Sequence, residues 1–220
     1  MKKTLTISIF FILFIAACSP PVSSILNDNT CDAPCWRAMT PGITTKEQAI
    51  NLLLKMDDVD KNTITEISGN NNYWQRGLKW SFIKVNENNG ALYFHDEKLI
   101  FLFTNYADKL TLSKVISKLG NPDGVYATRM VLDGTMVTYN LYYSSGVCVE
   151  VNTIRIKPKE VESKKGLYSA QIRPSERIKY IYYYDKSLSA DEINTTCYWQ
   201  YDKEKIQDWK GYGDYTFFTE

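Results

Sequence analysis

The chain has 220 residues, a formal net charge of +1 and 44% hydrophobic residues, which is ordinary for a globular protein. The near-neutral balance, without a run of like charges, argues against a nucleic-acid partner, because such partners usually require a basic patch. The 16 tyrosines favour strands, since aromatic and β-branched residues are enriched there.

Residues 1–17 have the pattern of an export signal. Lys2 and Lys3 precede an apolar run over 5–17, which is shorter than the ~20 residues that a membrane-spanning helix needs. Ile15-Ala16-Ala17-Cys18 then resembles the lipobox of bacterial lipoproteins, which are cut before a cysteine that receives lipid. The alternatives are an ordinary cleaved signal and an uncleaved anchor. We expect lipid on Cys18 to hold the chain to a membrane of the cell envelope, on the extracytoplasmic side. The sequence does not distinguish the inner from the outer membrane.

Cleavage before Cys18 would leave 203 residues (220 − 17) with a formal charge near −1, because Lys2 and Lys3 are lost from the +1 total. Residues 18–30 are polar, with two prolines, and we expect a lipidated, flexible tether there. Residues 31–220 are then expected to form one globular α+β domain. No further segment of the sequence is apolar over a membrane-spanning length.

Four cysteines remain besides Cys18, and an even number in an oxidising compartment suggests two disulfides with three possible pairings. We favour Cys31–Cys35 and Cys148–Cys197. A zinc site is the weaker reading, because the chain has no Cys-x-x-Cys pair and only one histidine. We therefore expect neither a metal nor another cofactor.

The first unit, about 31–105, reads as a helix followed by an antiparallel meander. Thr44 and Glu47 have capping-box spacing, and Ala49, Ile50 and Leu53 recur at helical spacing, so a helix is predicted over 45–55. Strands are expected at 64–68, 78–85, 91–94 and 99–103. A hairpin turn is predicted at 88–90.

The second unit, about 106–220, is predicted to restart the pattern. Thr111 precedes an apolar stripe, Gly120 stands at a helix C-cap, and Pro122 blocks continuation. Strands are expected at 125–131, 135–143, 147–152 and 178–184, a charged exposed loop at 157–166, and a packed aromatic tail after 209. The two predicted helices align at an offset of 66 residues (111 − 45), which suggests a tandem repeat. The alternative is two unrelated amphipathic helices.

The segments beginning at Thr40 and at Leu112 resemble the helix-opening segments of small envelope lipoproteins of the BamE type. The β-lactamase-inhibitor-protein fold also uses tandem helix-plus-sheet units. Cys31-Asp-Ala-Pro-Cys35-Trp36 further resembles the start of a group of uncharacterised bacterial lipoproteins, which often have Gly-Ile near this Trp, where this chain has Arg37-Ala38-Met39. The resemblance implies an α+β fold of two units and an envelope location, and it carries over no catalytic residue.

Enzyme motifs are scarce in this sequence. His95, the only histidine, stands beside a predicted turn without a nucleophile signature, and we interpret it as a solvated hairpin residue. Asp58, Asp60 and Asn62 match the start of a calcium loop, but the later glycine and glutamate positions hold Thr63 and Gly69, so a solvated helix end is the preferred reading.

The strand predicted at 178–184 suggests a binding surface. Tyr180, Tyr182 and Tyr184 alternate with Ile181 and Tyr183, so the three lie on one side of the sheet. If Ile181 faces the core, the three rings face outward or towards a partner; the competing view places them inward. The leading interpretation is a non-enzymatic binding or scaffold module for a protein or envelope component. The runner-up is an enzyme or enzyme inhibitor with an unrecognised site.

Overall fold

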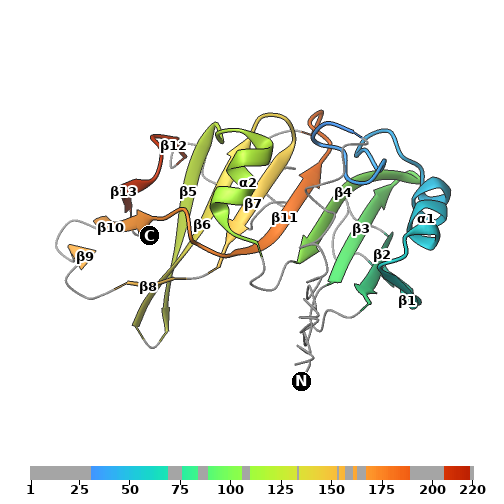
Figure 1. The fold of residues 1–220 in the computed structure, drawn as a ribbon, viewed down its shortest axis with the longest axis horizontal. Coiled ribbons are helices and arrows are strands. Elements are labelled where there is room, and N and C mark those ends of the chain that lie inside the picture. The colour runs from blue at the N-terminus through green and yellow to red at the C-terminus, as the bar shows by residue number, and fades with distance from the viewer. Residues whose placement is uncertain are drawn as a thin grey trace, which may run out of the picture.

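The computed structural model describes residues 31–68, 76–83, 89–105, 110–132, 134–152, 154–156, 161–162, 167–188 and 206–218. The predicted signal peptide, the tether at 18–30 and Cys197 lie outside these residues. The described chain is α+β, as predicted, and consists mostly of one large antiparallel sheet with two helices (Figure 1).

The helices and strands follow one another in this order: α1 (Lys46–Lys55), β1 (Val59–Ser68), β2 (Arg76–Phe82), β3 (Asn89–His95), β4 (Lys98–Asn105), α2 (Leu112–Leu119), β5 (Gly124–Leu132), β6 (Gly134–Tyr143), β7 (Val147–Val151), β8 (Ile154–Ile156), β9 (Val161–Glu162), β10 (Leu167–Ile172), β11 (Ile178–Tyr184), β12 (Gln207–Asp208) and β13 (Gly213–Phe218).

The large sheet runs in the order β1-β2-β3-β4-β11-β7-β6-β5-β12, with β8 paired to β6 as its tenth strand. The strands β1–β4 form a meander, and β5–β7 form a second one. The strand β11 joins them, because it pairs antiparallel with β4 on one side and β7 on the other. A separate sheet has the order β13-β10-β9.

One face of the large sheet carries the main hydrophobic core. Ala49 and Leu53 of α1, and Leu112 and Val115 of α2, belong to the same buried cluster as this face. Figure 1 shows α2 lying over β5–β7 and α1 at the other end of the sheet. The small sheet joins the same cluster through residues of β10 and β13. The opposite face of the large sheet is therefore left without a helix from the described residues.

The N-cap of helix α1 lies one residue later than predicted. Thr45, not Thr44, is the N-cap, and its hydroxyl accepts a bond from Gln48 N while the Gln48 side chain accepts one from Thr45 N. The Thr44 hydroxyl instead accepts a hydrogen bond from Thr40 N at 2.8 Å. The capping box is thus Thr45–Gln48, because Thr44 is occupied by the preceding turn.

Helix α2 matches its prediction closely. Thr111 is its N-cap, although without a side-chain capping bond, and Gly120 is its C-cap with φ of +83°. This left-handed conformation favours glycine, which explains why the helix ends there.

The predicted turn at 88–90 is wrong in its position. Asn89 and Gly90 already belong to β3, and Gly90 lies opposite Trp80. A Cβ on Gly90 would collide with the Trp80 indole, so this glycine serves close packing across the ladder and not the turn.

Residues 31–45, which we call the N-terminal strap, cross one end of the sheet before α1. Trp36 N and Met39 N exchange bonds with the carbonyls of Met39 and Trp36, closing a turn whose central residues Arg37 and Ala38 have φ of +49° and +64°. The Trp36 ring stacks on Trp80 with centroids 5.7 Å apart. The strap thereby joins the core.

Further contacts of the strap reach both meanders. Gly42 N donates to Leu99 O at the start of β4. Pro34 packs against Gly146 in the turn between β6 and β7.

The C-terminal tail packs as expected, since Tyr215 and Phe217 of β13 are buried in the core. The predicted loop at 157–166 needs correction, because it contains β9, which pairs with β10. The rest of that range lies outside the described residues.

Candidate binding face of the large sheet

The sheet face opposite the helices is rich in aromatic rings, and we call it the aromatic face. Side chains alternate between the two faces of a strand, so the core residues on β4, β11 and β6 place their chain neighbours on this side. Its rings come from β3, β4, β5, β6 and β11: Tyr93, Phe101, Phe103, Tyr126, Tyr142, Tyr180, Tyr182 and Tyr184.

The three predicted tyrosines lie on this face but differ in exposure. Ile181 is fully buried in the core, as the expected arrangement requires, while Tyr180 and Tyr182 are half-buried on the opposite side. Tyr184 is only 1% exposed, and its hydroxyl donates to Tyr143 O at 3.2 Å. The prediction of an open row of three is therefore wrong for Tyr184, which packs into the end of the sheet.

The rings of the face that come from β3, β4 and β11 form a connected group. Tyr182 stacks on Phe101 at 5.7 Å and 14°, and Phe103 meets Tyr180 edge-on at 5.6 Å. Tyr93 lies stacked against Phe103 at 6.5 Å. Such pairs stabilise the sheet by about 0.5–1.5 kcal/mol each beyond their buried area.

A buried carboxylate lies beside these rings. Glu150 of β7 is 2% exposed, and its Oε2 accepts a 2.7 Å hydrogen bond from the Tyr182 hydroxyl. Lys179 Nζ lies 3.2 Å from Oε1 of the same carboxylate and 5.1 Å from the Tyr180 ring centre. Glu150 is thus satisfied by one neutral and one cationic donor, as a buried carboxylate requires.

A β-bulge brings Lys179 to this carboxylate. The register between β11 and β7 shifts between Ile178 and Tyr180, which pair with Val151 and Glu150. Lys179 is the additional residue on β11, and bulges of this kind redirect a side chain.

Next to Glu150 lies a polar side chain without any partner. Asn140 of β6 is 0% exposed and pairs in register with Glu150 on one side and Tyr126 on the other. Neither its Nδ2 nor its Oδ1 makes a hydrogen bond within the structure. The face therefore combines aromatic rings, an ion pair and an unsatisfied amide.

The cysteines lie in two places. Cys31 and Cys35 form a disulfide in the strap, which is compatible with the favoured pairing. Cys148 is buried in the aromatic face and pairs with neither of them, and Cys197 lies outside the described residues. The Cys148–Cys197 pairing stays a prediction.

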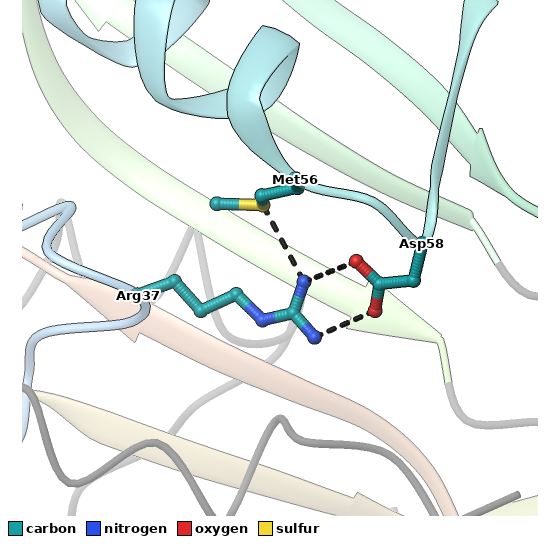
Figure 2. Close-up of polar contacts among 3 residues, drawn as sticks. All are labelled: Arg37, Met56 and Asp58. Atoms are coloured by element: carbon teal, nitrogen blue, oxygen red, sulfur yellow. Dashed lines mark hydrogen bonds and ion pairs between the residues drawn. The ribbon is translucent and has the colours of Figure 1, made fainter.

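The other candidate residues take simpler positions. His95 is exposed at the end of β3, with Asp96 Oδ2 3.6 Å from its Nε2. Asp58, the first residue of the calcium-like pattern, receives two 2.7 Å hydrogen bonds from Arg37, whose Nη1 also lies 3.4 Å from Met56 Sδ (Figure 2). Its carboxylate is thus engaged by a guanidinium. Among the described residues no cluster of His, Cys, Asp and Glu could hold a metal ion.

Sequence reasoning found the tyrosines of the face but missed Asn140, Glu150 and Lys179. The only available signal was an amide or a carboxylate inside each of two mostly apolar strands: Asn140 among 137–143 and Glu150 among 147–151. Their proximity depends on the pairing of β6, β7 and β11, which lies beyond local sequence patterns.

Comparison with protein-family models, curated proteins and solved structures finds no match to this chain. In the part of the chain that the structure describes, neither helix has the length and apolar character needed to cross a membrane.

Proposed function

We propose that this chain is a lipid-anchored lipoprotein of the cell envelope that works by binding, through its aromatic face, a protein or another envelope component. The observation that carries the proposal is the pair of half-buried rings, Tyr180 and Tyr182, on a face that no helix among the described residues covers. Tyrosine is enriched at interaction surfaces because its ring contributes contact area and its hydroxyl hydrogen-bonds.

The envelope location rests on the lipobox at Cys18. Metabolic labelling with a clickable fatty acid should mark the wild-type chain and leave Cys18→Ser unlabelled. Equal labelling of the two chains would contradict the anchor. Cys148→Ser is the matched control, because it removes a different cysteine and should keep the label.

Binding by the aromatic face can be tested by photocrosslinking in cells. Benzoylphenylalanine in place of the half-buried Phe103 should give discrete adducts with an envelope component. The same group at Ile43, which is 73% exposed and outside the face, should not. Similar adduct patterns from both positions, or none from 103, would contradict the proposed face and leave the enzyme or inhibitor alternative.

We further propose that the two halves are a tandem repeat of the kind seen in BamE-like or inhibitor-protein-like folds. Each half has a helix followed by a meander, and the halves meet where β4 pairs with β11. A chain of either half alone would test this: each should fold if the units are independent repeats, and neither should fold if they share one indivisible core.

A further inference from the structure

The buried side-chain amide of Asn140 lowers the stability of the fold, and nothing described so far explains why it is there. Burying an amide without hydrogen bonds costs about 1–3 kcal/mol in proteins, and native structures contain few such groups. Both the donor and the acceptor of this side chain are unused, although Asn140 lies opposite Glu150 in the ladder. An occupant that supplies an acceptor and a donor together would remove the cost.

The surroundings of Asn140 define what such an occupant must be. Directly opposed residues on neighbouring strands are about 4.5–5.5 Å apart, so Tyr126, Asn140, Glu150 and Tyr180 form a row across four strands. The adjoining Lys179 carries the charge opposite to that of Glu150, so the row and Lys179 together have no net charge. The adjoining half-buried rings of Tyr180 and Tyr182 offer apolar surfaces. The site therefore suits an uncharged ligand with both polar groups and flat apolar faces.

We propose that this row binds a saccharide chain carrying acetamido groups. The acetamido N–H and C=O match the two unused functions of the Asn140 amide, and sugar hydroxyls, which both donate and accept, match a carboxylate, an ammonium and tyrosine hydroxyls. The pyranose faces would lie on the rings of Tyr180 and Tyr182. The inference deepens the proposed function, on which it rests, by naming the class of envelope component.

Other classes of occupant fit the row less well. A peptide strand could not extend the sheet here, because the backbone groups of β6, β7 and β11 are already paired with neighbouring strands. An anionic polymer would be repelled by the Glu150 carboxylate. A purely apolar ligand would leave the Asn140 amide unpaired.

Access to the row runs past Lys179. Its side chain is 43% exposed and lies over both the Glu150 carboxylate and the Tyr180 ring. Asn140 itself is closed off from solvent, so a bound saccharide must displace neighbouring side chains, of which Lys179 is the most exposed.

The test is calorimetric titration of the purified full-length mature chain with a tetrasaccharide of N-acetylglucosamine, with thermal unfolding measured in parallel. We expect saturable binding that is about tenfold weaker in Asn140→Leu, which loses two hydrogen bonds to the ligand. The same substitution should raise the unfolding temperature, because it replaces an unsatisfied buried amide by an apolar side chain of similar size. Glu47→Gln on the exposed side of α1 is the control and should change neither quantity.

Two comparison ligands make the result decisive. The matching tetrasaccharide of glucose lacks the acetamido groups, and tetra-alanine has amides without sugar rings. Equal binding of either one, absence of saturable binding, or unchanged affinity in Asn140→Leu would overturn the saccharide proposal. A crosslinked protein adduct from position 103 in that case would show that the face still binds and that only the ligand class was wrong.

Discussion

Arg37 and Asp58, which are 21 residues apart in sequence, form a bidentate ion pair. Each guanidinium Nη atom lies 2.7 Å from a carboxylate oxygen. The guanidinium also lies over the Trp36 ring, 5.1 Å from its centre. This pair fastens the N-terminal strap to the junction between α1 and β1.

Asp58→Asn should therefore lower the free energy of unfolding. The substitution keeps the shape of the side chain and removes its charge. Because the Asp58 side chain is 42% exposed, solvent screening limits the expected loss to about 1 kcal/mol. Urea unfolding measures it. The neighbouring, exposed Asp57→Asn is the control, and an equal loss in both variants would show that the pair contributes nothing specific.

Tyr182→Phe should destabilise the chain by about 1–2 kcal/mol, because it removes the hydroxyl that donates to the buried Glu150 carboxylate while keeping the stacked ring. Tyr180→Phe is the matched comparison, since the Tyr180 hydroxyl makes no hydrogen bond in the described structure. Thermal and urea unfolding of the two variants should differ. Indistinguishable stabilities would mean that the hydroxyl bond has no net value.

Gly90→Ala should be more harmful than Gly120→Ala. The added methyl at 90 would collide with the buried Trp80 ring and force the ladder apart, costing about 3 kcal/mol or more. At 120 the methyl meets open space, and only the positive-φ backbone is strained, at about 1–3 kcal/mol. Unfolding midpoints rank the two, and the reverse order would contradict the close packing of β2 on β3.

Stability should fall in alkaline solution. Burial raises the pKa of Tyr183 and of Tyr143 far above the ordinary tyrosine value, so both stay protonated in the fold. Above about pH 10 the unfolded chain loses these protons and the folded chain does not, so the free energy of unfolding falls as pH rises, by up to ~1.4 kcal/mol per pH unit for each group. Urea midpoints measured across this range should drop steeply, and less steeply for Tyr183→Phe. A flat profile would speak against their burial.

Peptide mapping without reduction should recover Cys31 and Cys35 in one disulfide-linked fragment and Cys148 joined to Cys197. The first link is present in the structure, and the second remains expected from the even number of thiols. Reduced and alkylated protein provides the control digest. Alkylation of Cys148 in the unfolded but unreduced chain would refute the second link.

Local patterns predicted the local features of this fold. The apolar spacing of Leu112, Val115 and Leu119, with glycine after it, fixed α2 because helix contacts repeat every three or four residues. The cap of α1 was misplaced by one position. Thr44 and Thr45 each have a hydroxyl that could cap the helix, and the Thr44 hydroxyl is used in the preceding turn.

Features that depend on strand pairing were less accessible. Alternation along β11 correctly grouped the tyrosines on one face, but Tyr184 is buried among residues of other strands, and its hydroxyl bonds to the carbonyl of Tyr143, forty-one residues earlier. Asn140 and Glu150 become neighbours only through the register of β6 with β7. Lys179 joins them through a bulge, and the alternation rule would have assigned it to the other face.

If lipid on Cys18 holds the chain, as proposed, the disulfide in the strap has a mechanical consequence. A pull on the tether would enter the fold at Cys31 and pass through the S–S bond to Cys35 and the buried Trp36. The intervening loop would carry little of that tension, so the packing of Pro34 on Gly146 would be spared. The load would then fall on the strap's bonds to Leu99 in β4, an interior strand of the large sheet, and on the Arg37–Asp58 pair, which adjoins the edge strand β1.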